Sequence, residues 1–266
     1  INFLKKDLGD KIKTGYDISK IEQHDKQIKL TFKNNEVNEC DYLIISDGIF
    51  SKCKSLISNQ QTKPKFNDTL AIRGILTKSF EKIDNKNISL FLGSNFHQVI
   101  YPTNNRGDLN FIAIMKYKLS TEEQKNYSLF SDNSFIAKVL EKIPLENKEF
   151  LNNLKELKIF PVFTSKNFCE LQNDKIHLIG DAFFAFPPSF AQGASQSIES
   201  AYELFKDIEN NTESNFFKSR VNKIKMVNVR SKLNQFIFHL SSPLTIFFFF
   251  IFLKILFTNK EFLVSY

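Results

Sequence analysis

The sequence is poor in the residues that mark several classes of protein. It has only three cysteines, eight glycines and no tryptophan in 266 residues. The cysteines, Cys40, Cys53 and Cys169, are odd in number and lack C-x-x-C spacing. This pattern argues against a disulfide framework and against a zinc site, and it favours a location in the reducing cytoplasm. No Ser-His-Asp order, carboxylate pair or metal-ligand spacing stands out. We therefore predict neither a catalytic protein side chain nor a metal site.

Long apolar runs and blocks of charge are also scarce. The longest apolar stretch, 244–257, is interrupted by Lys254, whereas a membrane span needs roughly 20 apolar residues. We expect a buried or interface helix there, and keep peripheral membrane contact through this Phe-rich helix as an alternative. The net charge of +7 comes from scattered lysines, which argues against a nucleic-acid partner. The start lacks a signal peptide and an initiator methionine, so we expect a fragment.

The stretch from Lys175 to Leu204 carries most of the information. A buried strand is predicted over Ile176–Ile179 and stops at Gly180-Asp181. Pro187-Pro188 then keeps the chain extended, and a helix begins near Gln192-Gly193. Its apolar residues, at helical spacing, are Ile198, Ala201, Tyr202 and Phe205.

This order of elements favours a nucleotide-cofactor site. A carboxylate at a strand end accepts hydrogen bonds from sugar hydroxyls, and the free N–H groups of a helix start face electron-rich ligand atoms. An ordinary strand-to-helix connection explains the same pattern without a ligand.

Other strands are predicted on both sides of this stretch. Ile18–Gln23 and Gln27–Phe32 form a hairpin, and Tyr42–Ile45 is a short strand that ends on Ser46-Asp47-Gly48. Four closely spaced strands predict an antiparallel layer: Ala71–Leu76, Ile88–Gly93, His97–Thr103 and Leu109–Met115. Residues 120–158 are helical in pattern, with an apolar stripe at Phe135, Val139, Leu140 and Ile143. Ile159–Thr164 is predicted to be the last strand, which crosses back to the part of the chain that holds the cofactor site.

The order Gly-Asp-Ala, proline and a helix-starting glycine resembles the second FAD-binding motif of the flavin-dependent aromatic hydroxylases, the class A monooxygenases. Asp41 to Lys54 resembles the Asp-Gly motif of the same family. The resemblance implies FAD and NAD(P)H, with cofactor-binding residues at Asp47, Gly48, Gly180, Asp181, Ala182, Pro188, Gly193 and Ala194. The chain departs from the family at Phe184, usually histidine, at Ala191, usually glycine, and at Ser195, usually asparagine.

The resemblance also implies a fold. It is α/β, with a Rossmann-like FAD-binding domain of the glutathione-reductase type, an inserted antiparallel-sheet substrate domain and C-terminal helices. The predicted divisions are 1–60 and 166–210 for the FAD-binding domain, 61–165 for the substrate sheet with its covering helices, and 211–266 for the C-terminal helices. The family's first motif, G-x-G-x-x-G, is missing, so we expect a truncated FAD-binding domain.

The implied activity is hydroxylation of an aromatic or similar small molecule with NAD(P)H and O₂, in the manner of the salicylate-hydroxylase branch. Arg73, His97 and Tyr101 are the implied substrate-side residues, and an arginine fork suits a carboxylate or phenolate. His97 and Tyr101 are also explained as one polar face of a strand. Alternatives are a flavin-dependent reductase or dehydrogenase on this scaffold, and an FAD-less interaction protein. A homodimer is a further possibility.

Overall fold

The computed structural model describes residues 7–24, 27–58, 63–77, 80, 83, 86–103, 107–143, 148–171, 174–240 and 247. The chain divides into two compact units. The first comprises 1–64, 165–186 and 191–226, and the second comprises 65–164, 187–190 and 227–266.

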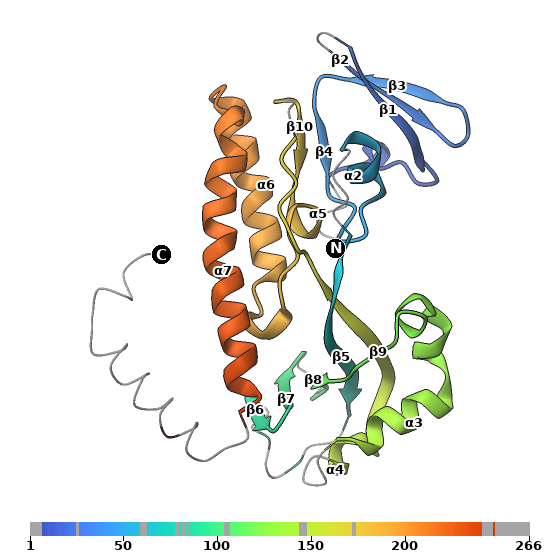
Figure 1. Ribbon diagram of the computed structural model, residues 1–266, viewed down its shortest axis with the longest axis vertical. Coiled ribbons are helices and arrows are strands. Elements are labelled where there is room, and N and C mark those ends of the chain that lie inside the picture. Colours follow the sequence, from blue (N-terminus) through green and yellow to red (C-terminus); the bar gives the residue numbers. More distant parts are fainter. Residues whose placement is uncertain are drawn as a thin grey trace. The chain divides into compact units, whose positions relative to one another are not determined.

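The first unit begins with a short 3-10 helix, η1 (Gly9–Lys11), and an antiparallel sheet of three strands in the order β1-β2-β3. The strands are β1 (Ile18–His24), β2 (Gln27–Phe32) and β3 (Val37–Cys40), drawn in blue in Figure 1. The predicted hairpin is thereby confirmed. Alternate residues of β2 are buried because successive side chains of a strand point to opposite faces.

A second, parallel sheet of the first unit joins two segments that are far apart in the sequence. β4 (Leu43–Ile45) pairs with β10 (Ile176–Leu178), and all three residues of β10 are buried. Short helices follow each strand, α2 (Lys52–Ile57) after β4 and α5 (Gly180–Phe183) after β10. Both predicted strands are confirmed, and their ends converge because the pairing is parallel.

Two longer helices complete this part of the chain. α6 (Gly193–Glu209) is followed by η6 (Glu213–Asn215) and α7 (Phe216–Phe238), and α6 lies alongside the first half of α7 (Figure 1). The predicted helix at Gly193 is confirmed. Its apolar stripe is exposed, however, with Ile198 71%, Tyr202 62% and Phe205 54% accessible, while Ser200 and Leu204 face the interior.

The second unit contains an antiparallel sheet of five strands in the order β6-β7-β8-β5-β9. These strands are β5 (Lys65–Leu76), β6 (Ser89–Gly93), β7 (Phe96–Pro102), β8 (Leu109–Lys116) and β9 (Leu154–Thr164). The predicted antiparallel layer is confirmed. One of its faces packs against η3 (Tyr127–Ser131), α3 (Asn133–Glu141) and α4 (Lys148–Leu151), around buried residues such as Phe111 and Val139. The short helix η2 (Glu123–Lys125) precedes η3 and buries none of its residues.

One predicted boundary is wrong. The helical pattern was expected to reach residue 158, but β9 begins at Leu154, which pairs with Leu76 of β5. Charged residues at 155, 156 and 158 gave this segment a helical composition. They lie on an edge strand, where charged side chains protect the free edge from pairing with another chain.

The C-terminal apolar run, 244–257, lies outside the described residues except for Phe247. Among the helices that the structure describes, none has the length and apolar character to cross a bilayer.

Candidate functional site

The ends of β4 and β10 lie side by side in the first unit. Leu178 pairs with Ile45, and the N–H of Ile179 donates to the carbonyl of Ile45 at 3.0 Å. Asp47-Gly48 and Gly180-Asp181 therefore leave the same edge of a parallel sheet, where α/β folds place their ligands. The two motifs are separated by more than a hundred residues in the sequence, and the sheet brings them together.

Gly180 fixes how closely β10 approaches α6. Its φ of +58° lies in the region that favours glycine, and an added Cβ would come within 2.9 Å of the Ser197 Oγ. The Gly180 N–H also donates to the Ser200 Oγ at 3.3 Å. A glycine at this position lets the strand end pack directly on the helix.

Asp181 stands at the mouth of a small cavity that Gly180, Gly193, Ser197 and Arg220 also line. Within the described part of the chain its carboxylate has no hydrogen-bond partner. Nearby protein atoms partly desolvate it and raise the pKa of Asp181, although the residue as a whole is exposed. An acceptor without a protein partner fits the role of binding a hydroxyl group of a ligand.

Asp47 is already engaged by the protein. Its Oδ2 accepts a hydrogen bond from the N–H of Cys53 at 3.1 Å, at the start of α2. Ser51 is the N-cap of that helix and accepts from the N–H of Lys54 at 3.0 Å. Gly48 has a φ of +81°, so the turn itself favours glycine. The Asp-Gly motif therefore has a local structural role in starting α2.

The start of α6 presents N–H groups that have no acceptor within the helix. Gly193 and Ala194 are exposed in this first turn, and nothing lies within 4 Å of a Cβ built on Gly193. Ser195 supports the turn, because its Oγ donates to the Gln192 carbonyl at 3.0 Å. The preceding Ala191 has a φ of +52°, a conformation that favours glycine.

The other residues of this motif lie mainly in the interior. Ala182 and Phe184 are buried, and Phe184 stacks on Phe168 with ring centroids 4.4 Å apart. A phenylalanine in place of the family's histidine therefore joins the apolar core. Pro188 is exposed and begins a 3-10 helix, η5 (Pro188–Phe190), which belongs to the second unit.

The second unit has its own cavity, of about 270 Å³, on the sheet face opposite the apolar core. Among its lining residues are Arg73, Asn110, Glu156 and Lys158. The Nδ2 group of Asn110 is buried and has no hydrogen-bond partner among the described residues. Arg73 and Lys158 supply two positive charges and the Asn110 amide an unpartnered donor, while Glu156 supplies one carboxylate. This balance favours binding of an anionic small molecule.

Gly74 and Glu156 shape this cavity. A Cβ on Gly74 would lie 2.9 Å from Leu154, and the register between β5 and β9 shifts between Arg73 and Ile75. Glu156 has a φ of +53° at the same irregularity. Such a bulge changes the direction of neighbouring side chains and is common beside binding sites.

Tyr101 and His97 share the sheet face of Arg73. Tyr101 lies opposite Asn110 of β8, next to the cavity, whereas His97 lies farther along the strand. His97 is 3% exposed, and its Nδ1 is 2.9 Å from the Nε2 of His239. Burial lowers the pKa of both imidazoles to about 4. The structure thus places His97 in a buried histidine pair, apart from the cavity.

Several residues of these sites were not predicted. The sequence pattern predicts a helix at Lys158 and a strand at Asn110, and it predicts only C-terminal helices around Arg220 and His239. The unpartnered amide of Asn110 and the pairing of the two histidines depend on tertiary contacts. Only the positive charge of Arg220 and Lys158 was visible in the sequence.

The fold and the paired strand ends define an α/β protein whose candidate site lies where α/β folds bind their ligands. A family profile described as "FAD binding domain" matches residues 5–213. The chain belongs to this family, and the predicted relationship to flavin-dependent aromatic hydroxylases and the predicted α/β fold class are confirmed.

Individual relatives agree with this assignment. A salicylate hydroxylase of Pseudomonas putida is 26% identical over 215 residues, which cover 70% of this chain and 47% of that protein. A chloroplastic zeaxanthin epoxidase of an Oncidium hybrid cultivar is 22% identical over 214 residues, covering 79% and 30%. The chain spans about half the length of the salicylate hydroxylases that it matches.

Solved structures share the fold. Klebsiella pneumoniae HpxO, crystallised with FAD and uric acid, has a TM-score of 0.73 at 14% identity, over 85% of this chain and 58% of that one. A salicylate hydroxylase in a substrate complex has a TM-score of 0.69 at 18% identity, over 91% and 66%.

Proposed function

We propose that this chain is part of an FAD-dependent monooxygenase that hydroxylates an aromatic or similar small molecule with NAD(P)H and O₂. One observation carries the proposal: the two cofactor motifs leave one edge of the β4–β10 sheet, next to the start of α6. Bound FAD would supply the redox chemistry, taking electrons from NAD(P)H and activating O₂.

The residues present fit FAD. The unpartnered carboxylate of Asp181 is suited to a ribityl or ribose hydroxyl, and the exposed first turn of α6 is suited to an electron-rich edge of the flavin. Gly48 and Gly180 allow the backbone to turn at the same edge. We propose Asp47, Gly48, Gly180, Asp181, Ala182, Pro188, Gly193 and Ala194 as the cofactor-binding set, with the buried Ala182 contributing its backbone only.

The substrate is proposed to bind on the sheet of the second unit, within the division 61–165. Arg73 would pair with an anionic group of the substrate, and Tyr101 lies on the same face. His97 supports that sheet through His239. The free thiols of Cys40, Cys53 and Cys169 agree with the cytoplasmic location that we propose.

Flavin content is the first test. The 266-residue chain, and any longer natural form that extends it, should be purified and the FAD content measured by absorbance and by extraction. We expect FAD in the extended protein, and NAD(P)H oxidation that forms a hydroxylated product from an aromatic acid. NAD(P)H oxidation without oxygen insertion would favour a reductase or dehydrogenase, and absence of FAD from both proteins would refute the proposal.

A further inference from the structure

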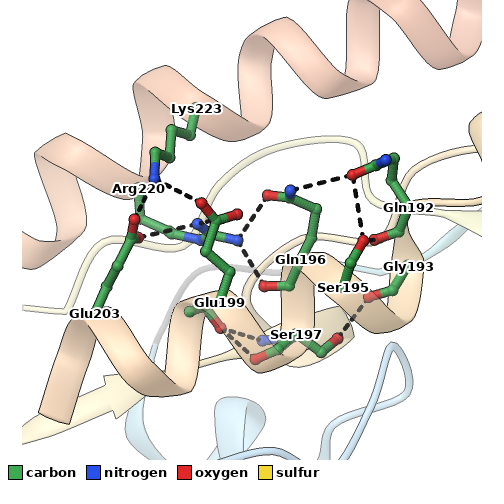
Figure 2. A network of polar contacts seen from close by, with 11 residues as sticks. Gln192, Gly193, Ser195, Gln196, Ser197, Glu199, Glu203, Arg220 and Lys223 are labelled. Carbon is green, nitrogen blue, oxygen red and sulfur yellow. Dashed lines mark hydrogen bonds and ion pairs between the residues drawn. The ribbon is translucent and has the colours of Figure 1, made fainter. Parts of the chain in front are cut away.

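Arg220 of α7 is almost fully buried, with 1% of the residue exposed. Its guanidinium is held by the neighbouring helix α6 (Figure 2). Nη1 donates to the Glu203 carboxylate at 3.0 Å and lies 3.4 Å from that of Glu199. Burying a cation is costly unless it is paired and fully hydrogen-bonded, so this arrangement has a strong geometric requirement.

The second amino group of Arg220 reaches the start of α6. Nη2 donates to the carbonyl oxygen of Gln196 at 2.6 Å and to the Oε1 of the same residue at 2.8 Å. Gln196 in turn donates from its Nε2 to the Oε1 of Gln192 at 3.3 Å and from its backbone N–H to the Gln192 carbonyl at 2.9 Å. A chain of hydrogen bonds therefore runs from α7 to the residue that precedes the helix.

This chain of hydrogen bonds ends at a turn that needs external support. Gln192 is the N-cap of α6, and among the described residues its side chain caps no N–H of the helix. The residue before it, Ala191, has a positive φ, which is unfavourable for an L-amino acid. Helix starts fray easily when their N–H groups are uncapped. Ser195 holds Gln192 from within the helix, and the contact of Arg220 with Gln196 adds a second hold from outside it.

We infer that Arg220 is a positioning residue that fixes the first turn of α6, 192–196, in the orientation required to bind FAD. The planar fork of an arginine donates to two directions at once, here to Glu203 and to Gln196. A lysine ammonium cannot reproduce that geometry. The inference that the turn is fixed stands by itself, while its connection to FAD rests on the proposed function.

Lys223 provides a matched control. Its ammonium binds Glu199 at 2.7 Å and also Glu203, but the side chain is 43% exposed and makes no hydrogen bond to Gln196 within the described part of the chain. Replacing it removes one positive charge from the same cluster without releasing the helix start. Comparison of the two positions separates the effect of charge from that of geometry.

The test uses Arg220→Met, Arg220→Lys and Lys223→Met in the 266-residue chain and in any longer form that binds FAD. Amide hydrogen exchange of the segment 187–197 is measured without FAD, and FAD affinity is measured by quenching of flavin fluorescence. We expect both Arg220 variants to exchange at least tenfold faster in this segment and to bind FAD at least tenfold more weakly. Lys223→Met should match the parent protein in both measurements.

A fourth variant covers the case in which Arg220→Met does not fold. Gln196→Met keeps the buried ion pair and the backbone hydrogen bonds but loses the side-chain bonds to Arg220 and Gln192, and it should also accelerate exchange in 187–197. Unchanged exchange in both Arg220→Lys and Gln196→Met would overturn the inference. If the parent protein binds no FAD in any form, the proposed function fails, and the exchange measurements still decide whether Arg220 positions the turn.

Discussion

Ala191 adopts a backbone conformation that a glycine would occupy more readily. Its φ of +52° places the Cβ close to the following carbonyl, which costs an L-residue roughly 1–2 kcal/mol. The related family usually has glycine here. The structure explains the family preference by the shape of the turn itself, since the turn is formed even with alanine present.

The first prediction follows from that strain. Ala191→Gly should raise the free energy of unfolding by about 1 kcal/mol, because the gain at positive φ exceeds the entropy that glycine adds to the unfolded chain. Ala201→Gly, at an exposed position inside α6, is the control and should lower stability by about 1 kcal/mol. Urea unfolding of both variants measures the difference. Equal destabilisation by the two changes would refute the strain at Ala191.

Gln98 is a second residue whose side chain is unfavourable at its position, because it is polar and buried. The side chain is fully buried among apolar neighbours of the sheet, and both its Oε1 and its Nε2 lack partners in the described structure. Gln98→Met keeps the length and removes the unpaired groups, so it should raise the free energy of unfolding by about 1 kcal/mol. Gln124→Met removes a hydrogen bond to the Leu119 carbonyl and should be destabilising instead. Thermal unfolding compares them, and a loss of stability in Gln98→Met contradicts the prediction.

At the scale of elements, the histidine pair joins β7 to the residue that follows α7. Both imidazoles are buried, and burial is the main cause that lowers the pKa of each to about 4. His239 lowers the pKa of His97 further, and Lys116 lowers that of His239. The Nδ1 of His239 is buried without a partner among the described residues. The pair is therefore stable only while both rings are neutral.

Because of this pair, we predict that the free energy of unfolding decreases in acid. In the unfolded chain a histidine binds a proton near pH 6.5, whereas in the folded chain these two bind theirs only near pH 4. The unfolded state thus binds more protons between these values, and stability falls as the pH falls through this window, by up to roughly 1.4 kcal/mol per pH unit for each histidine. Above pH 6.5 the pair makes no pH-dependent contribution.

The measurement is urea unfolding at a series of pH values from 7.5 to about 4.5. The double variant His97→Phe, His239→Leu should lose most of the pH dependence above about pH 5. The remaining part should come from His177, whose pKa is also lowered by burial, and toward about pH 4.5 from carboxylates such as Glu199, whose pKa is lowered by Lys223. His24→Asn changes an exposed histidine on β1 and should retain the slope of the parent protein. An unchanged slope in the double variant would show that the pair is not its source.

The elements of this fold were largely visible in the sequence, because their apolar patterns are local. β2 alternates between apolar and polar residues, and β10 is a short, mostly apolar segment that ends before Gly180-Asp181, so local patterns predict both strands. The predicted strand is shorter than β9, because the charged residues at the start of β9 give that segment a composition typical of a helix. The residues of the sites are harder to predict from the sequence. Motifs indicate Asp181 and Arg73. The hydrogen bond from Arg220 to Gln196 joins two helices, and no local sequence pattern predicts how those helices pack.

At the scale of the whole molecule, the net charge is positive, and the cavity of the second unit is also lined by more cations than carboxylates. Lysine and arginine total 36 against 29 acidic residues, and the cavity beside β5 shares this bias with Arg73 and Lys158 against Glu156. A positive concave surface raises the local concentration of anions and speeds their binding. The proposed substrate class, an aromatic acid, matches both the charge of the chain and that of the cavity.

Arg73→Ala tests this match. The change should weaken binding of salicylate by roughly tenfold to a hundredfold, since a hydrogen bond to a charged group contributes about 1.5–3 kcal/mol. Binding of the neutral analogue salicylamide should change far less, because it has no carboxylate for the guanidinium to hold. Lys65→Ala, at the exposed start of the same strand and outside the cavity lining, is the control. Isothermal titration measures both ligands against the parent protein and the two variants, each in the form that binds FAD. Equal losses for the acid and the amide would mean that Arg73 supports the fold and does not recognise the anion.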